Sequence, residues 1–203
     1  MATELAVERG CSASWNASLS RAGRSAHVLL VGCMNPHQQL RILAQSQAQL
    51  VGLDSRQDMI ESQRADVEAG VSQADILFLN RVELAALVPG HGTDWCEAAR
   101  SLLGPGRLRA VVVKGGPAGA ACVTRTQVIE RPAHPVDRVV DPTGAGDALA
   151  GGFSADVPNS GAMTRGRTPM RSMLGCSAPP LRFRSFGVDA LVALSPPDSP
   201  HST

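Results

Sequence analysis

Short apolar runs alternate with polar segments between residues 27 and 131. Four of these runs are rich in leucine and β-branched residues and carry polar side chains only at their ends, which is typical of strands buried on both faces. The predicted strands cover residues 27–32, 50–54, 75–80 and 109–114. Because helical patterns lie between them, the order predicts a parallel sheet with helices on both faces.

The segments between these runs carry helix signals. Asn35 and Pro36 provide an N-cap and a proline at the first helical position, and the apolar spacing that follows predicts a helix over residues 36–49. Further helices are predicted over residues 58–70, 83–88 and 94–103. After Gly115 and Gly116 the pattern shortens, and residues 119–124 and 127–131 are predicted to form a hairpin.

Composition restricts the classes of function. The hydrophobic content of 43% and the charged content of 18% are typical of a globular chain, and the net charge of +1 indicates no general nucleic-acid or membrane-surface partner. Aromatic residues make up only 3%, which argues against stacking on single-stranded nucleic acid. The N-terminal residues contain no apolar signal core, so we expect a cytoplasmic protein without a transmembrane segment.

One stretch, residues 139–153, carries the clearest chemistry. An apolar run is followed by the small residues Gly144, Ala145 and Gly146, and then Asp147 opens a helical segment. The first N–H groups of a helix have no intrahelical partners and attract anions. A carboxylate beside such a site suits a base that activates the group attacking a phosphate. The alternative is a helix N-cap with glycines that serve only the turn.

Residues 141–153 read Asp-Pro-Thr-Gly-Ala-Gly-Asp-Ala-Leu-Ala-Gly-Gly-Phe, which resembles the second signature of the ribokinase-like (PfkB) carbohydrate and nucleoside kinases. The resemblance implies a three-layer α/β fold with a mainly parallel sheet, use of ATP and Mg²⁺, and a sugar or nucleoside as acceptor. It also implies that Asp147 is the catalytic base and that residues 144–146 form the anion hole for the transferred phosphoryl group.

Asn80 and Glu83 form an Asn-x-x-Glu pair directly after a predicted strand. The pair resembles the family motif whose glutamate helps to hold hydrated Mg²⁺, and an indirect carboxylate suits that ion. The alternative is structural, with Asn80 capping the helix and Glu83 in its favourable first turn.

Other residues resemble the family's nucleotide side. These are Lys114, Gly115, Gly116 and Gly119 at a strand end, together with Thr143 beside the anion hole. An ordinary glycine-rich turn is the alternative for this segment. Asp54 also ends a strand and resembles an acid that the family carries at this position. The resemblance implies that Asp54 has a polar structural role or lies on the phosphate side of the site. The alternative is that Asp54 is a helix N-cap.

The resemblance covers residues 27–153 and returns faintly over residues 185–194. We therefore expect an N-terminally truncated member of the family that diverges after Phe153. Its parts would be an incomplete kinase domain (residues 1–153), a divergent loop-like or disordered segment (154–184) and a family-like C-terminal segment with a frayed tail (185–203). An exposed sheet edge would permit oligomers.

Two interpretations of function stay open at this point. One is an ATP-dependent phosphotransferase with weak or no activity of this chain by itself, and the other is an inactive nucleotide-binding remnant or non-functional fragment. A Rossmann dehydrogenase is disfavoured because no Gly-x-Gly-x-x-Gly follows the early strands. A P-loop enzyme is disfavoured because Lys114 precedes its glycines.

Overall fold

The computed structural model describes residues 15–133, 135, 139 and 141–160, and these form one six-stranded sheet with seven α-helices. The strands are β1 (Val28–Val31), β2 (Leu50–Asp54), β3 (Ile76–Asn80), β4 (Ala110–Lys114), β5 (Ala120–Thr124) and β6 (Val128–Arg131). The helices are α1 (Arg21–Arg24), α2 (Pro36–Leu43), α3 (Gln57–Ser62), α4 (Arg64–Gln73), α5 (Arg81–Leu87), α6 (Trp95–Ser101) and α7 (Ala145–Ser160).

The sheet keeps its strands in chain order, from β1 to β6. The first four strands are parallel, and β5 and β6 add an antiparallel hairpin. Both the parallel core and the hairpin were predicted from the sequence, and both are confirmed. Because parallel strands all end at the same edge, the residues that close β2, β3 and β4 come together there.

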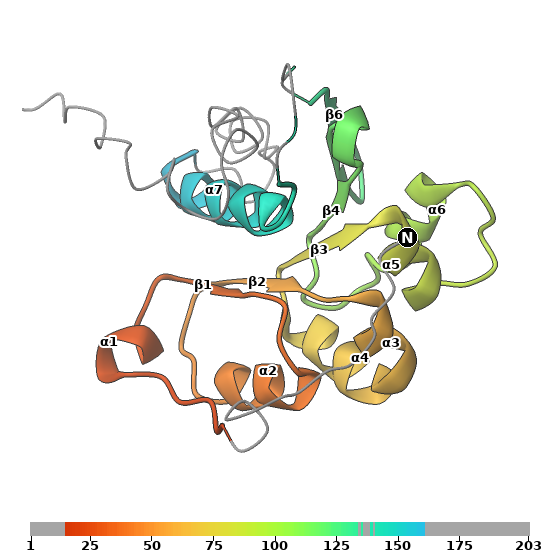
Figure 1. Cartoon of the computed structure of the whole chain (residues 1–203). Helices are drawn as coiled ribbons and strands as arrows, with labels where there is room; N and C mark the ends of the chain where they lie inside the picture. The colour runs from red at the N-terminus through yellow and green to blue at the C-terminus, as the bar shows by residue number, and fades with distance from the viewer. Residues whose placement is uncertain (1–14, 134, 136–138, 140, 161–203) are drawn as a thin grey trace, which may run out of the picture.

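The helices are divided unequally between the two faces of the sheet. Crossovers between neighbouring parallel strands are right-handed, so the intervening helices of a sheet in chain order fall on one face. Accordingly, α2, α3 and α4 lie together on one side of the sheet in Figure 1, whereas α7 lies on the other side and packs on β1 and β2. The predicted three-layer arrangement is therefore confirmed.

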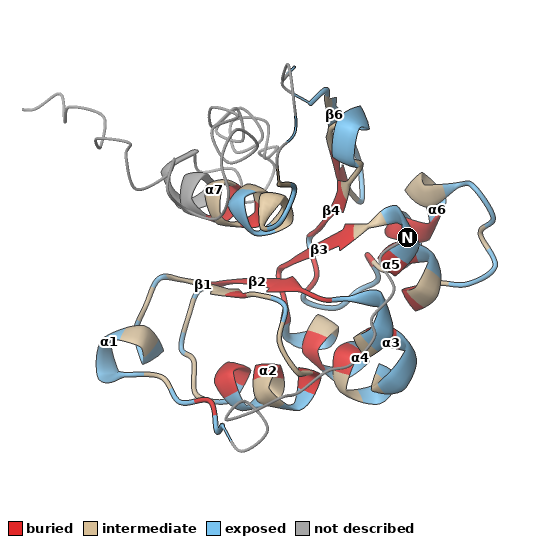
Figure 2. Cartoon of the chain, viewed as in Figure 1, coloured by how far each residue is buried: buried red, intermediate tan, exposed pale blue. Residues whose placement is uncertain are grey.

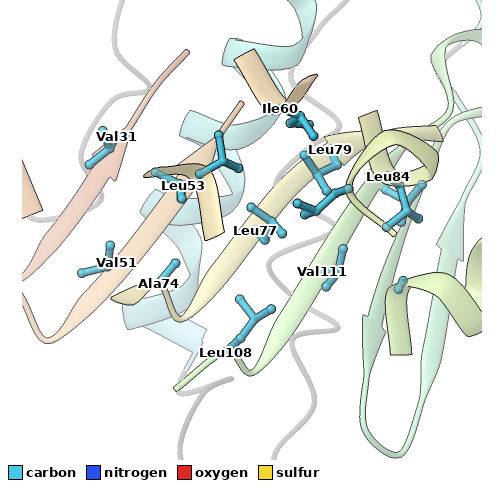
Figure 3. Packing of buried hydrophobic residues seen from close by; sticks show 14 of the residues in the cluster. Val31, Val51, Leu53, Ile60, Ala74, Leu77, Leu79, Leu84, Leu108 and Val111 are labelled. Atoms are coloured by element: carbon cyan, nitrogen blue, oxygen red, sulfur yellow. The ribbon is translucent and has the colours of Figure 1, made fainter. Parts of the chain in front are cut away.

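Two hydrophobic clusters fill the spaces between these layers. The larger cluster joins the sheet to the helices α2–α6, and it includes the leucines, valines and isoleucine drawn in Figure 3. The smaller cluster lies under α7, where Phe153 is fully buried against Phe78. Figure 2 shows the buried residues concentrated along the strands and on the inner sides of the helices.

A close approach holds α7 on the sheet. A Cβ atom on Gly52 of β2 would lie 3.1 Å from the Phe78 ring and 3.3 Å from the hydroxyl of Ser154. A larger residue at position 52 would therefore push α7 outward, and the glycine permits the tight packing that positions the helix start.

The largest differences between predicted and observed boundaries concern three elements. The helix predicted over residues 36–49 ends at Leu43. The reason is that the next residues bind the N-terminal segment instead: Gln45 donates from its side chain to the carbonyl of Ala17, and Gln47 donates its N–H to the carbonyl of Arg24. Leu50, which completed the apolar spacing, belongs to β2.

The polar helix predicted over residues 58–70 is two helices, α3 and α4, which meet at Gln63 with φ −134° and ψ 42°. The break lets each helix pack on its own neighbour, α3 on α5 and α4 on α2. Toward the C-terminus, we expected a loop-like or disordered segment from residue 154, but α7 continues to Ser160 and takes Pro158 into its last turn. The family-like segment predicted over residues 185–194 lies outside the described residues.

Candidate active site

Three polar side chains meet at the carboxyl edge of the parallel strands. Asp54 ends β2, Asn80 ends β3 and Lys114 ends β4, and Asn80 is the register partner of Lys114. The side chains of Asp54 and Lys114 bridge across β3 on the face that α7 covers, because they alternate with residues that face the larger cluster. The fold thus brings together residues 60 positions apart in the chain.

Lys114 and the buried Asp54 form a largely buried ion pair. The Lys114 Nζ lies 2.8 Å from Oδ1 and 2.9 Å from Oδ2 of Asp54, and the two side chains are only 17% and 5% exposed. Burial raises the pKa of Asp54, although the charge and hydrogen bond of Lys114 oppose the rise, and nearby Asp147 contributes to it. The N–H of Ser55 donates a further hydrogen bond to Oδ1.

Asn80 and Glu83 form a complete capping box at the start of α5. The Glu83 N–H donates to the Asn80 Oδ1 at 2.8 Å, and the Asn80 N–H donates to the Glu83 Oε2 at 2.6 Å. The capping interpretation of this pair is therefore confirmed. Its role toward Mg²⁺ stays a prediction.

Glu83 also faces the ion pair. Its Oε2 lies 3.9 Å from the Lys114 Nζ, and its side chain is buried. Burial raises the pKa of Glu83, while the N–H of Asn80 and the charge of Lys114 oppose the rise. The carboxylate is thus held on the inner side of the strand edge rather than in open solvent.

Residues 144–147, here called the glycine turn, lead into α7. Gly144 has φ +76°, a conformation that favours glycine. The N–H of Thr143 donates to the Asp141 side chain at 2.9 Å, and the N–H of Ala145 donates to the carbonyl of Pro142 at 3.2 Å. The anion hole was predicted to consist of the N–H groups of residues 144–146. The N–H of Ala145, however, is already used in the hydrogen bond to Pro142 that closes the turn. Those of Gly146 and Asp147 belong to the first helical turn, which leaves them without i−4 partners.

The glycine turn lies directly on Lys114. A Cβ atom on Gly146 would come within 3.4 Å of both Cδ and Nζ of Lys114. Asp147 projects from the same turn and is exposed. The structure thereby brings the Asp147 segment, Lys114, Asp54 and Glu83 into one place.

The charges of this cluster do not balance. Three carboxylates, those of Asp54, Glu83 and Asp147, surround the single ammonium of Lys114, so the fully ionised cluster carries two more negative than positive charges. Within the described part of the chain, no group of three histidine, cysteine, aspartate or glutamate side chains is arranged to hold a metal ion directly. A cation at this site would need other ligands as well, such as water or phosphate oxygens.

The geometry of the glycine segment after β4 explains why two of its positions are glycine. Gly119 has φ +93°, and a Cβ atom there would lie 2.0 Å from the carbonyl oxygen of Arg131. The Gly115 N–H donates to the Gly119 carbonyl at 2.7 Å, and a Cβ atom on Gly115 would lie 3.0 Å from that oxygen. The turn interpretation therefore accounts for both glycines, and a nucleotide contact there remains a prediction.

A pocket of about 330 Å³ opens beside this segment. Val113 and Ala121 form part of its floor, and the Arg81 guanidinium lies 5.2 Å from the centre of the Trp95 ring at its wall. Val113 belongs to the larger cluster, on the face of β4 opposite to Lys114. The pocket is therefore separate from the Lys114 cluster. No signal in the sequence pairs Arg81 with Trp95, and this contact was not predicted.

The described residues also give information on membrane insertion and on the cysteines. None of the helices in the described ranges is long and apolar enough to cross a membrane. Cys33 and Cys96 carry free thiols.

Solved structures of similar fold are kinases. The adenosine kinase from Sinorhizobium meliloti aligns with a TM-score of 0.66 and 20% identity, over 82% of this chain and 51% of that one. A nucleoside kinase from Methanocaldococcus jannaschii, described as an archaeal member of the ribokinase family, aligns with a TM-score of 0.63 and 22% identity, over 87% and 55%. At these identities the likeness shows the fold alone.

Sequence relatives are closer. A cytidine kinase from Thermococcus kodakarensis is 36% identical over 135 residues, which cover 64% of this chain and 47% of the relative. An ATP-dependent ribose-1-phosphate kinase from Halopiger xanaduensis is 36% identical over 124 residues, covering 53% and 38%. The chain thus spans about half the length, or less, of the curated relatives that it matches.

The family model described as pfkB family carbohydrate kinase matches residues 33–164. This range contains Asp54, the capping box, Lys114 and the glycine turn, and it extends beyond Phe153, where we expected the resemblance to end. The chain belongs to the pfkB family of carbohydrate kinases.

Proposed function

We propose that this protein is an ATP-dependent phosphotransferase that acts on a hydroxyl group of a sugar or nucleoside. The observation that carries the proposal is the contact between Lys114 and the glycine turn at the carboxyl edge of the sheet. There an ammonium group, the start of a long helix and an exposed carboxylate converge. Ligands of open α/β sheets bind at this edge.

Asp147 would act as the base. It lies in the first turn of α7 and is exposed, so an acceptor hydroxyl can reach it. Phosphoryl transfer requires mainly positioning and charge neutralisation, and a carboxylate that accepts the hydroxyl proton fits that requirement. The N–H groups of Gly144 and Gly146 would receive the transferred phosphoryl group, with Ala145 holding the turn between them.

Magnesium would accompany the nucleotide. The excess of two negative charges in the cluster repels a free triphosphate, and a divalent cation would offset it. Asn80 and Glu83 would hold the ion indirectly, through water, because Glu83 is engaged in the capping box. Mg²⁺ prefers oxygen ligands and retains several of its waters, which suits this arrangement.

The rest of the nucleotide would lie along the turn after β4. Lys114 would face the phosphates, and Gly115, Gly116, Gly119 and Thr143 would line the path of the nucleotide. We place these residues within a kinase-like unit that extends through residue 153.

The relatives suggest the class of acceptor. They include proteins named cytidine kinase, ribose-1-phosphate kinase and nucleoside kinase, so we favour an acceptor that contains ribose. Because this chain spans about half the length of these relatives, we state their kinase activity only as a proposal for it. A cytoplasmic location also remains a prediction.

A second candidate is nucleotide binding without transfer. It is favoured by the coverage of only 47% of the cytidine kinase, which leaves more than half of that relative without a counterpart in the match. The Lys114 cluster and the glycine turn would then bind Mg-ATP with no acceptor beside it.

The two functions separate in one set of measurements. ADP release is followed with cytidine, adenosine, ribose and ribose 1-phosphate as acceptors, for the wild type and Asp147→Asn, and Mg-ATP binding is measured by calorimetry for both. Turnover that Asp147→Asn abolishes supports the transferase. Binding without turnover selects the second candidate, and the absence of binding overturns both.

A further inference from the structure

The pocket beside the turn after β4 lies apart from the residues proposed for phosphoryl transfer. Its floor includes Val113 and Ala121, whereas Lys114 falls on the other face of the sheet, because neighbouring residues of a strand point to opposite faces. Its volume of about 330 Å³ lies at the lower end of the range of small-molecule sites. The pocket can therefore hold a small ligand on the face opposite to Lys114.

Two opposite charges border this pocket. At one wall the Arg81 guanidinium lies 5.2 Å from the centre of the Trp95 ring. On another side lies Glu130, the register partner of Ala121 in the hairpin, so its side chain falls on the same face of the sheet as the pocket floor. Neither Arg81 nor Glu130 forms an ion pair with a residue in the described part of the chain. Both charges are therefore available to a ligand.

The electrostatics of Cys96, on α6, agree with this placement. Burial is the main reason why the pKa of the Cys96 thiol is raised; the charge of Glu130 adds to the rise, and the charge of Arg81 opposes it. Both side chains therefore lie within electrostatic reach of one residue of α6, although they come from β6 and α5.

A third charged residue, Arg131, also lines the pocket. It shares the face of Lys114, because both are register partners of Ala120 in β5. Its guanidinium donates to the carbonyl of Glu130 at 2.9 Å. The charged side chains on the face of the pocket floor are thus one cation and one anion.

We infer that this pocket binds a small zwitterion of the amino-acid class with an apolar side chain. The Arg81 guanidinium would bind the carboxylate, because stacking on Trp95 uses its face and leaves the N–H groups at its edge for a planar acceptor. Glu130 would accept hydrogen bonds from the ammonium group. The apolar side chain would lie on Val113 and Ala121. A ligand with a single charge would compensate only one of the two groups, so the pocket favours the zwitterion.

Leucine and two of its analogues test the assignment on the full chain. Isocaproate lacks the ammonium group of leucine and isoamylamine lacks its carboxylate, while all three share the same apolar body. We expect saturable binding of leucine in calorimetry and an affinity about tenfold or more lower for isocaproate and for isoamylamine.

Fluorescence reports where the ligand binds. The chain has two tryptophans, so Trp15→Phe leaves Trp95 as the single emitter. Leucine is expected to change the emission of Trp95, because the ligand would contact the guanidinium that stacks on the ring. An emission that stays unchanged at saturating leucine would place the ligand elsewhere and overturn the inference.

Two variants separate the two charges. Arg81→Met is expected to weaken leucine binding about tenfold or more and to retain the affinity for isoamylamine. Glu130→Gln is expected to weaken leucine binding about three- to fivefold, because Glu130 is exposed, and to retain the affinity for isocaproate. Retained binding of one analogue shows that each variant is folded. Arg41→Met and Glu61→Gln, which remove exposed charges on α2 and α3, are the matched controls and should bind leucine as the wild type does.

The inference does not depend on the proposed function. Leucine binding that falls in Arg81→Met and Glu130→Gln, with both controls unchanged, supports it. It is overturned if the wild type shows no saturable leucine binding, if all variants bind leucine equally, or if Mg-ATP displaces leucine and so assigns the pocket to the nucleotide. A wild type that binds leucine but no Mg-ATP would remove only the proposed function.

Discussion

The rings of Phe78 and Phe153 meet edge to face, with centroids 5.7 Å apart and planes inclined by 82°. Phe78 belongs to the strand that ends at Asn80, and Phe153 belongs to the helix that begins beside Asp147. This contact, together with the close approach at Gly52, determines where the start of α7 lies relative to the strand edge.

Replacement of Phe153 by alanine is expected to destabilise the protein. The side chain is fully buried, and loss of a buried phenylalanine costs about 3–5 kcal/mol through lost burial and the cavity left behind. Urea unfolding measures the change, with Phe153→Leu as the control that keeps most of the volume. A loss below about 1 kcal/mol in the alanine variant would show that α7 contributes little to the fold.

Alanine at position 146 is expected to weaken Mg-ATP binding tenfold or more. The added Cβ would lie in van der Waals contact with the Lys114 Cδ and Nζ, at 3.4 Å, and would occupy the space between the turn and the ammonium into which a phosphate would have to fit. Gly151 in the same helix is the matched control, because a Cβ atom there meets nothing within 4 Å. Gly151→Ala should bind normally and gain up to about 1 kcal/mol of stability from helix propensity. Equal affinity of Gly146→Ala and Gly151→Ala for Mg-ATP would show that the approach of the glycine turn to Lys114 does not matter for binding.

The stability of the wild type relative to Glu83→Gln is expected to fall as the pH rises. Glu83 has a pKa raised above 4.5, mainly by burial, so the folded state holds its proton to higher pH than the unfolded state does. Stability from that proton is fully present below pH 4.5 and is lost as the pH rises through the folded pKa.

Glutamine keeps the capping acceptor and cannot ionise, which makes Glu83→Gln the appropriate reference. Urea unfolding of both proteins at a series of pH values from 4 to 7 measures the difference (roughly the range in which such a carboxyl titrates). The raised pKa would be contradicted if the difference in unfolding free energy between the two proteins stayed constant, or if the wild type became relatively more stable as the pH rises.

ATP binding is expected to depend strongly on a divalent cation. The ionised cluster carries two more negative than positive charges, so ATP in the presence of EDTA should bind much more weakly than Mg-ATP at low salt. Glu83→Gln removes one of the negative charges and should reduce the difference between the two conditions. Calorimetry with and without Mg²⁺ measures both effects, and equal affinity under the two conditions would show that the local charge does not govern binding.

The acid at the opposite end of the sheet should matter for stability alone. Asp75 is 1% exposed, accepts a hydrogen bond from the Val51 N–H at 2.9 Å and pairs with Arg107 at 2.8 Å. Asp75→Ala leaves that buried N–H without its acceptor and breaks the ion pair, which should cost about 3 kcal/mol in urea unfolding. Mg-ATP binding by the folded variant should be unchanged. A selective loss of binding would indicate that the two ends of the sheet are coupled.

Much of the fold could be predicted because its signals are local. Apolar runs gave β1 to β4, and Asn35 with Pro36 marked the start of α2. Helix ends were harder, because they depend on distant partners. Helix α2 ends before Gln45, whose side chain binds the carbonyl of Ala17, 28 residues away. Nothing near Gln45 in the sequence indicates this contact.

The site was predicted in pieces rather than as a unit. The glycine turn and the Asn80–Glu83 pair stand out as motifs, but the sequence allowed a structural or a metal role for the pair, and the capping box bears out the structural one. The Lys114–Asp54 pair joins positions 60 residues apart, and spacing alone does not reveal it. The one available signal was the solitary lysine in an arginine-rich chain.

The path of the chain into α7 has a consequence for how the protein folds. This helix follows β6 in sequence but packs on β1 and β2, at the other edge of a sheet that keeps its strands in chain order. Contacts between segments so far apart in sequence form slowly, because a long loop must close before they contribute any stabilisation. The strands and their crossover helices can assemble from neighbours, whereas the glycine turn can reach Lys114 only after that sheet exists. Assembly of the active site should therefore be among the last events of folding, and a nucleotide that binds there would stabilise the end of the pathway rather than its beginning.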